Sequence, residues 1–162
     1  MTRDEALKEL TDAGWTDLSH GHRGGFYNGA HYSFGKNVTT RTIKNYWGTT
    51  ETFTEAQQRI SASTSGGTYC CGMPELGHLH ITGGSKVSAN DIALVLRYIL
   101  ANEGTGYLRC ALTSQRTYAK WRAGLELAGF TPTVTLPSKH GRGRYKVVAY
   151  DYIDREMHKE AA

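Results

Sequence analysis

The chain has 162 residues, of which 39% are hydrophobic and 21% are charged, and its formal net charge is +4. These values are typical of one folded domain with one core, and they exclude an intrinsically disordered chain. The pI of about 9.0 makes nucleic acid a minor alternative partner, because a small excess of positive charge is more often a solvated surface.

Targeting and cysteine signals are weak in this sequence. No apolar run approaches the roughly 20 residues that span a bilayer, and the start of the chain is polar and charged, unlike a secretory signal. Cys70, Cys71 and Cys110 are an odd number without the spacing of a metal site. We therefore expect a cytoplasmic protein with no metal and no membrane contact. Cys110 lies in an apolar stretch and is expected to be a small buried side chain.

The first predicted element is a helix over residues 2–13. Thr2 and Glu5 have the spacing of a capping box, and Gly14 stands where helices commonly end. We expect Trp15, just past this glycine, to pack back against the last helical turn.

Residues 24–47 are rich in β-forming side chains and are predicted to be extended. Turns are predicted at Asn28-Gly29 and at Gly35-Lys36-Asn37. A second capping-box spacing, from Thr52 to Glu55, predicts a short helix that ends near Ile60. Residues 61–67 are predicted to be a polar loop.

The second half alternates strands and helices. Strands are predicted over residues 69–73, 76–82, 107–113, 133–136 and 145–152. A capping-box spacing at Ser88 and Asp91 opens one helix, which runs to about Asn102, and Ser114 can cap a second helix with Tyr118, Trp121, Leu125 and Ala128 on one face. This alternation predicts a single α/β domain over residues 1–162, with a mixed sheet that closes in an antiparallel hairpin and a charged tail from residue 153.

Three features of residues 68–152 resemble the GNAT superfamily of N-acetyltransferases. Glu75-Leu-Gly-His-Leu-His-Ile81 stands in the place of the family's central strand, and the helix from Asp91 to Ala101 follows at the usual offset. The second helix ends in Leu127-Ala-Gly-Phe130 before a hairpin, a familiar GNAT ending. The resemblance implies a GNAT-like mixed central sheet flanked by helices, with residues 1–67 as a loosely matching first half.

The resemblance also implies a cofactor site. GNAT enzymes bind acetyl-CoA at a turn of the form Arg/Gln-x-x-Gly-x-Gly/Ala between the central strand and its helix, and the arginine slot of that motif falls on Lys86. Val87, Ala89 and Asp91 replace the following positions, and the carboxylate among them would repel phosphate. The cofactor-binding residues that the resemblance predicts are Leu79, Ile81, Gly83, Gly84, Ser85 and Lys86.

The catalytic residues follow less directly from the family pattern. Many GNAT enzymes have a Tyr four residues before the Gly of the Gly-Phe ending, and Leu125 occupies that slot here. The candidates for proton transfer are therefore His78, His80 and Tyr118. With these residues the protein would transfer an acyl group from acetyl-CoA to an amine substrate, or act on a protein partner.

Two other classes of function stay open. The GNAT-like shell could be a non-catalytic binding or structural protein, as in phages, which would place it in an infected host cell or a virion. Alternatively, His31-Tyr-Ser33 and His80-Ile-Thr82 resemble the paired His-x-Ser/Thr triplets of 2H phosphoesterases, in which one His is the base and the other the acid. His78 and His80 also have the spacing of two metal ligands on a strand, but no third ligand can be named.

One aromatic pair stands apart from these motifs. Tyr46 and Trp47 lie near Arg41 and Lys44. Such a group is typical either of a surface that stacks on nucleic-acid bases or of a half-buried strand.

Overall fold

A computed structural model describes residues 1–19, 31–65, 78–83, 86–104, 107–113, 118–137 and 146–154. Its elements in chain order are α1 (Arg3–Asp12), β1 (Trp15–Asp17), β2 (His31–Lys44), β3 (Thr50–Ser65), β4 (His78–Gly83), α2 (Ala89–Glu103), β5 (Tyr107–Thr113), α3 (Tyr118–Leu127), β6 (Thr131–Pro137) and β7 (Lys146–Ile153). The predictions that concern Asn28-Gly29, Cys70, Cys71, residues 69–73, Gly84, Ser85 and Ser114 lie outside the described residues.

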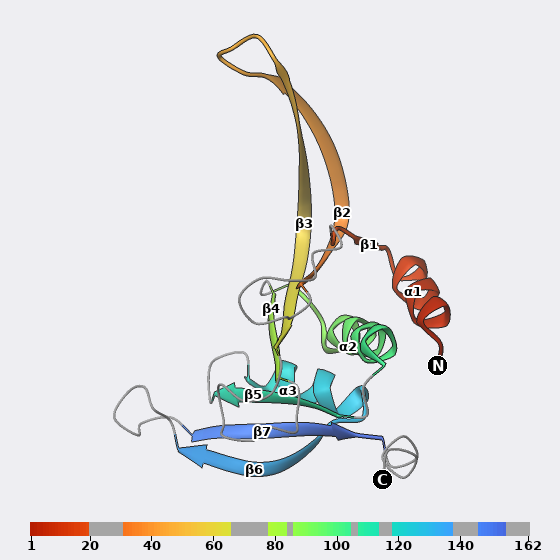
Figure 1. Cartoon of the computed structure of the whole chain (residues 1–162), viewed down its shortest axis with the longest axis vertical. Helices are drawn as coiled ribbons and strands as arrows, with labels where there is room; N and C mark the ends of the chain where they lie inside the picture. Colours follow the sequence, from red (N-terminus) through yellow and green to blue (C-terminus); the bar gives the residue numbers. More distant parts are fainter. Residues whose placement is uncertain are drawn as a thin grey trace.

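The described strands form one mixed sheet in the order β1-β2-β3-β4-β5-β7-β6 (Figure 1). β4 and β5 are parallel neighbours, as the strand–helix–strand pattern predicted, and the other neighbouring pairs are antiparallel. β6 and β7 form the predicted closing hairpin. None of the helices described here is long and apolar enough to cross a bilayer.

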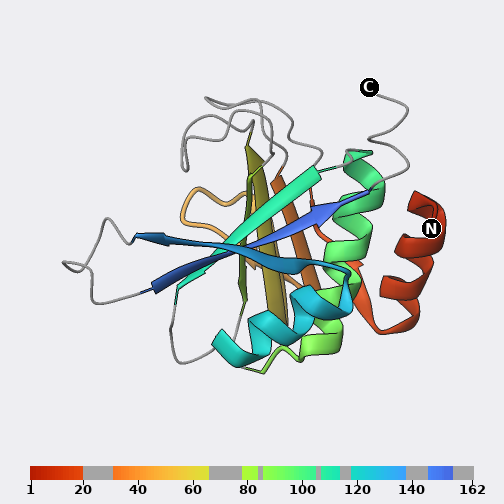
Figure 2. The same ribbon diagram turned by 90° about the horizontal axis from the view of Figure 1, so that it is seen from below.

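α1 and α2 begin where the capping signals predicted. Thr2 and Glu5 form a capping box at α1, and Ser88 and Asp91 form one at α2. α2 lies between α1 and α3 (Figure 2), and its buried residues join those of the strands in one hydrophobic cluster. Trp15 is buried in this cluster, and its indole N–H donates to Asp91 at the start of α2, a contact across 76 residues of chain.

The middle of the chain differs from its prediction. Residues 31–44 and 50–65 are two long strands that pair in one register, from His31 opposite Ser63 to Lys44 opposite Thr50. The turn predicted at residues 35–37 is therefore wrong: Asn37 has a φ of 55° inside β2, and a Cβ at Gly35 would lie 2.8 Å from Leu18 and 2.9 Å from Ala56. These residues form a tightly packed irregularity in a continuous strand.

The helix predicted from Thr52 to Ile60 is also wrong, and so is the loop predicted over the part of residues 61–67 that is described. Both segments belong to β3. The capping-box spacing is a local signal, whereas threonines at alternate positions favour a strand once a partner strand is available. Here β2 supplies that partner along the whole length of β3.

The far part of this hairpin projects from the body of the molecule (Figure 1). β1 pairs with β2 only as far as Lys36, and β4 pairs with β3 only from Ile60 onward. Residues 37–59 are therefore a two-stranded ribbon, which we call the arm.

Candidate active site

The central feature of the site is the divergence of the two parallel strands. In the described residues, β4 and β5 pair at one position, His78 opposite Arg109, although the two strands are 6 and 7 residues long. Beyond that position they separate, as Figure 1 shows. We call the two strand edges beyond this pair the fork. In open α/β sheets, ligands bind at the carboxyl ends of parallel strands, which is the end where this fork opens.

The chain reaches the amino terminus of α2 a few residues after β4 ends. The capping box gives this terminus its own carboxylate: Ser88 Oγ donates to Asp91 Oδ2 at 2.9 Å, and the backbone N–H of Asp91 donates to Ser88 Oγ at 3.2 Å. The other oxygen, Oδ1, accepts from Trp15 Nε1 at 3.0 Å. Both oxygens of Asp91 are thus held by donors of the protein.

The predicted cofactor residues reach this region in different ways. Leu79 and Ile81 lie in β4, opposite Thr64 and Ala62 of β3, and Gly83 ends the strand. The side chain of Lys86 is exposed just before α2, and its carbonyl accepts from Gln58 Nε2 at 3.3 Å. Val87, in one of the motif's slots, is 2% exposed and belongs to the core.

The candidate proton-transfer residues lie on two elements. His78 and His80 are alternate positions of β4. Tyr118 begins α3, and α3 crosses the first turn of α2 closely: a Cβ at Gly124 would lie 2.6 Å from Ile92 Cγ2. Tyr118 lies six residues before that crossing, or about 9 Å along a helix axis.

Leu125, in the family's tyrosine slot, is fully buried. The hydroxyl that the family pattern places there is therefore replaced by an apolar core side chain. Cys110 is also buried, which confirms the expectation of a small core residue, and this burial raises the pKa of the Cys110 thiol to about 12.

A buried ion pair stands at the closed end of the fork. Arg109 and Asp151 are 2% and 4% exposed, and the guanidinium donates from Nε to Oδ1 at 2.7 Å and from Nη2 to Oδ2 at 2.8 Å. Thr133 Oγ1 donates to the same Oδ2 at 2.7 Å. Arg109 is the β5 residue that lies opposite His78. The pair therefore joins β5 and β7 at the point from which the fork opens.

This pair was not among the residues predicted from the sequence. The available signal was one charged residue inside each of two otherwise apolar or aromatic strands, Tyr107-Leu-Arg-Cys110 and Tyr150-Asp-Tyr152. Charged residues at such positions are rarely buried unless they are paired, but the sequence does not say which acid meets which base.

The register also relates the two histidine triplets. His31 of β2 and His80 of β4 both lie opposite Ser63 of β3, which runs between them. The three positions form one row across three strands, with the histidine backbones roughly 10 Å apart because neighbouring strands are about 4.8 Å apart.

The architecture is similar to that of solved GNAT acetyltransferases. Aminoglycoside acetyltransferase AAC(6′)-Ib with coenzyme A and kanamycin matches at a TM-score of 0.50 and 12% identity over 83% of this chain and 72% of that one. Its structure with acetyl-CoA matches at 0.50 and 10% over 83% and 70%. Ribosomal-protein-alanine N-acetyltransferase from Brucella melitensis matches at 0.46 and 14% over 94% and 76%.

The two matches at a TM-score of 0.50 define the class of the fold. No protein-family model and no curated protein sequence matches this chain. The chain has a GNAT-like fold, as residues 68–152 predicted. At identities this low the likeness concerns the fold alone, and activity has to be argued from the site.

Proposed function

We propose that the protein transfers an acyl group from acetyl-CoA to an amine. The observation that carries the proposal is the fork, because no strand among the described residues pairs with the edge of β4 that faces β5 beyond His78. An extended ligand arm that contains amides can bind such an edge in the manner of an added strand. The overall fold is similar to that of neighbours that were solved with acetyl-CoA or coenzyme A.

The residues around the fork fit this cofactor. Leu79 and Ile81 would hold its amide-containing arm through their backbone groups, together with Gly83. Gly84, Ser85 and Lys86 would lie toward its phosphates, where the exposed ammonium of Lys86 supplies a positive charge. The carboxylate of Asp91 is engaged by Trp15 and Ser88, and this engagement limits its repulsion of a phosphate nearby. When bound, acetyl-CoA supplies an acyl group as a thioester.

The chain's own residues would manage the protons. An amine attacks only when it is neutral, so a base must accept a proton as the new carbon–nitrogen bond forms and the carbon–sulfur bond breaks. His78 or His80 suits that role because imidazole titrates near neutral pH. The hydroxyl of Tyr118 would return a proton to the leaving thiolate.

The test combines binding with turnover. Acetyl-CoA should raise the melting temperature in proportion to its binding, and free thiol should appear when amines are added from a panel of polyamines, aminoglycosides and peptides. Lys86→Ala should weaken acetyl-CoA binding several-fold, whereas a change at another exposed lysine, Lys8→Ala on α1, should not. His78→Ala, His80→Ala and Tyr118→Phe should lower turnover more than binding. Absence of both binding and thiol release would refute the proposal and leave a non-catalytic GNAT-like protein.

A second candidate function rests on the row His31–Ser63–His80. Histidine positions on the two strands that flank a serine position are a pattern in which one imidazole could act as base and the other as acid on a phosphate ester. In that case a 2′,3′-cyclic phosphate would be hydrolysed without acetyl-CoA. Both His31→Ala and His80→Ala would abolish that hydrolysis, whereas His78→Ala would spare it.

A further inference from the structure

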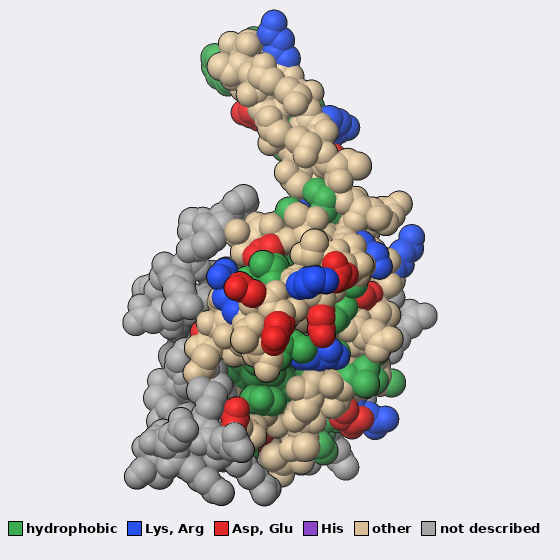
Figure 3. Space-filling view, turned by 90° about the vertical axis from the view of Figure 1, so that its right-hand side faces the viewer, with side chains coloured by type: hydrophobic (Ala, Val, Ile, Leu, Met, Phe, Trp, Pro, Cys, Tyr) green, Lys and Arg blue, Asp and Glu red, His purple; other side chains and the backbone are tan. Residues whose placement is uncertain are grey.

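The tip of the arm presents two aromatic side chains to solvent. Tyr46 and Trp47 are 94% and 83% exposed, and their rings meet edge to face with centroids 5.4 Å apart. Ile43 and Phe53, further down the arm, are also exposed. Figure 3 shows the arm as a narrow projection with apolar and basic side chains at its end. Exposed aromatic groups of this kind commonly mark an interaction site.

The turn that carries the two rings is held by hydrogen bonds. The backbone of Asn45 donates to the carbonyl of Thr49 at 2.8 Å, and Gly48 donates to the carbonyl of Asn45 at 3.0 Å. The Oδ1 of Asn45 accepts from the backbone N–H of Trp47 and of Thr49, each at 3.0 Å. The rings are therefore displayed on a fixed turn, which lowers the entropy that a ligand must overcome on binding.

The charge of the arm favours an anionic partner. Residues 37–59 contain three basic and two acidic side chains, so the arm carries a net charge of +1. Arg41 pairs with Glu55 at 3.2 Å, and Glu51 accepts from Asn45 Nδ2 at 3.1 Å. Within the described residues, Lys44 at the tip takes part in no ion pair.

Exposed hydroxyl groups complete this surface. The threonines of the two strands and the turn are exposed along the arm: Thr39, Thr40, Thr42, Thr49, Thr50, Thr52 and Thr54. Hydroxyl groups and lysines are the side chains that commonly bind phosphate oxygens of nucleic acids, and aromatic side chains on a basic surface stack on unpaired bases.

We infer that the tip of the arm binds single-stranded nucleic acid. Bases stack on Trp47 and Tyr46, while Lys44 and the neighbouring threonines contact the phosphates. A second copy of this chain is less favoured, because a stable dimer buries roughly 800 Å² per partner and the apolar surface here is confined to a few side chains. This inference goes beyond the proposed acyl transfer and uses none of its residues.

Tryptophan fluorescence can follow the binding directly. Trp15 and Trp121 are 2% and 8% exposed, so Trp47 is the tryptophan that a bound base can reach from solvent. Titration with oligo(dT) and oligo(U) 12-mers at low salt should quench the emission and give a dissociation constant. Trp47→Ala, followed by anisotropy of labelled oligonucleotide, should weaken binding about tenfold, which corresponds to one stacked base. Trp47→Phe should recover most of the affinity.

Charge is tested through salt. Lys44→Ala should weaken binding and reduce the slope of log K against log salt by about 0.7, the value for one phosphate contact on a single strand. The matched control is Leu127→Ala, which removes an apolar side chain, 54% exposed, from α3 and should leave both affinity and slope unchanged. Circular dichroism of each variant checks that the fold is retained.

Three results would overturn the inference. One is the absence of quenching at low salt, and another is an affinity that Trp47→Ala and Lys44→Ala leave unchanged. The third is that the parent protein binds no oligonucleotide but self-associates, or co-sediments with anionic vesicles, and that Trp47→Ala abolishes this association. Because acetyl-CoA is absent from these assays, failure here is distinct from failure of the proposed acyl transfer.

Discussion

Loss of the Asp151 carboxylate should be among the most destabilising single changes in this chain. Asp151→Ala removes two hydrogen bonds to Arg109 and one to Thr133, all between 2.7 and 2.8 Å. The Arg109 guanidinium, 2% exposed, would then remain in the interior without its carboxylate. Breaking a buried pair by removing one partner costs about 3–5 kcal/mol.

The expected cost can be measured by urea unfolding followed by far-ultraviolet circular dichroism. For a chain of this size, about 4 kcal/mol corresponds to a fall in melting temperature of roughly 10 °C. The same change should weaken acetyl-CoA binding, because the pair fixes the closed end of the fork. Arg109→Met with Asp151→Leu removes both charges and should recover most of the lost stability, since an apolar pair of similar volume is often neutral or better.

The exposed pair between Arg41 and Glu55 provides the comparison. These side chains are 62% and 57% exposed and lie 3.2 Å apart, so Glu55→Ala should cost less than about 1 kcal/mol. If Asp151→Ala costs no more than Glu55→Ala, the reasoning from burial is refuted.

Three further changes test the packing. Gly124→Ala should destabilise the fold by about 1–3 kcal/mol despite the better helix propensity of Ala, because the new Cβ would lie 2.6 Å from Ile92 Cγ2. A variant that melts at a higher temperature than the parent would show that α2 and α3 separate easily. Trp121→Ala should cost about 3–5 kcal/mol, since Trp121 is 8% exposed, and a near-unchanged melt would argue against its burial. Burial raises the pKa of Cys110 from 9.0 to about 12. As the pH rises, the thiol therefore ionises first in the unfolded chain, and its contribution to the free energy of unfolding falls from about pH 9 upward. Above that pH the free energy of unfolding of Cys110→Ala should fall less steeply than that of the parent protein, and equal slopes would contradict this.

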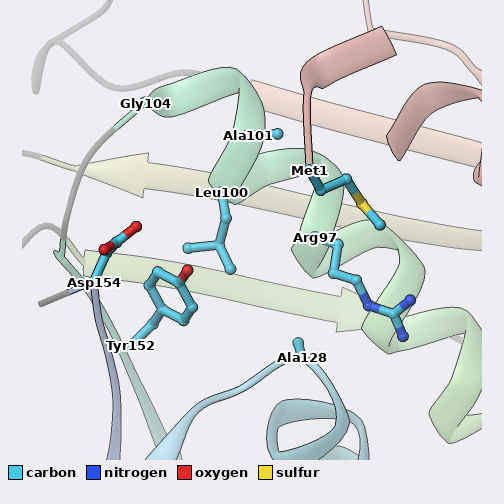
Figure 4. Close-up of a pocket in the computed structure, with 8 residues that line it drawn as sticks. All are labelled: Met1, Arg97, Leu100, Ala101, Gly104, Ala128, Tyr152 and Asp154. Atoms are coloured by element: carbon cyan, nitrogen blue, oxygen red, sulfur yellow. The ribbon is translucent and has the colours of Figure 1, made fainter. Parts of the chain in front are cut away.

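One pocket, which Met1 and Asp154 help to line, carries no role in these proposals. It has a volume of about 290 Å³ and lies between α2, Ala128 and the end of β7, where Arg97, Leu100 and Tyr152 line it (Figure 4). Arg97 is engaged with Glu9 at 3.4 Å. The pocket lies near the carboxyl end of α2, away from the fork at its amino end.

Local signals in the sequence predicted the helices well and the long hairpin poorly. Ser88 and Asp91 define the start of α2 by hydrogen bonds within four residues, so their spacing alone was sufficient. Thr52 and Glu55 have the same kind of spacing but lie in β3, because pairing with β2 along its length outweighs one local cap. The propensity of threonine for strands pointed to this outcome, but no local rule weighs it against a capping box.

The sequence by itself determined the alternation of strands and helices in the second half, the parallel relation of β4 and β5, and the resemblance to GNAT enzymes, because these depend on periodicity and caps within short segments. Only the tertiary structure decided that β4 and β5 part after one pair, that Arg109 meets Asp151, and that Trp15 binds the carboxylate at the start of α2. It also decided that Tyr46 and Trp47 lie at the end of an exposed arm instead of in the core. Each of these facts depends on which distant segments become neighbours, and that choice follows from burial and pairing over the whole chain, which no short window of sequence contains.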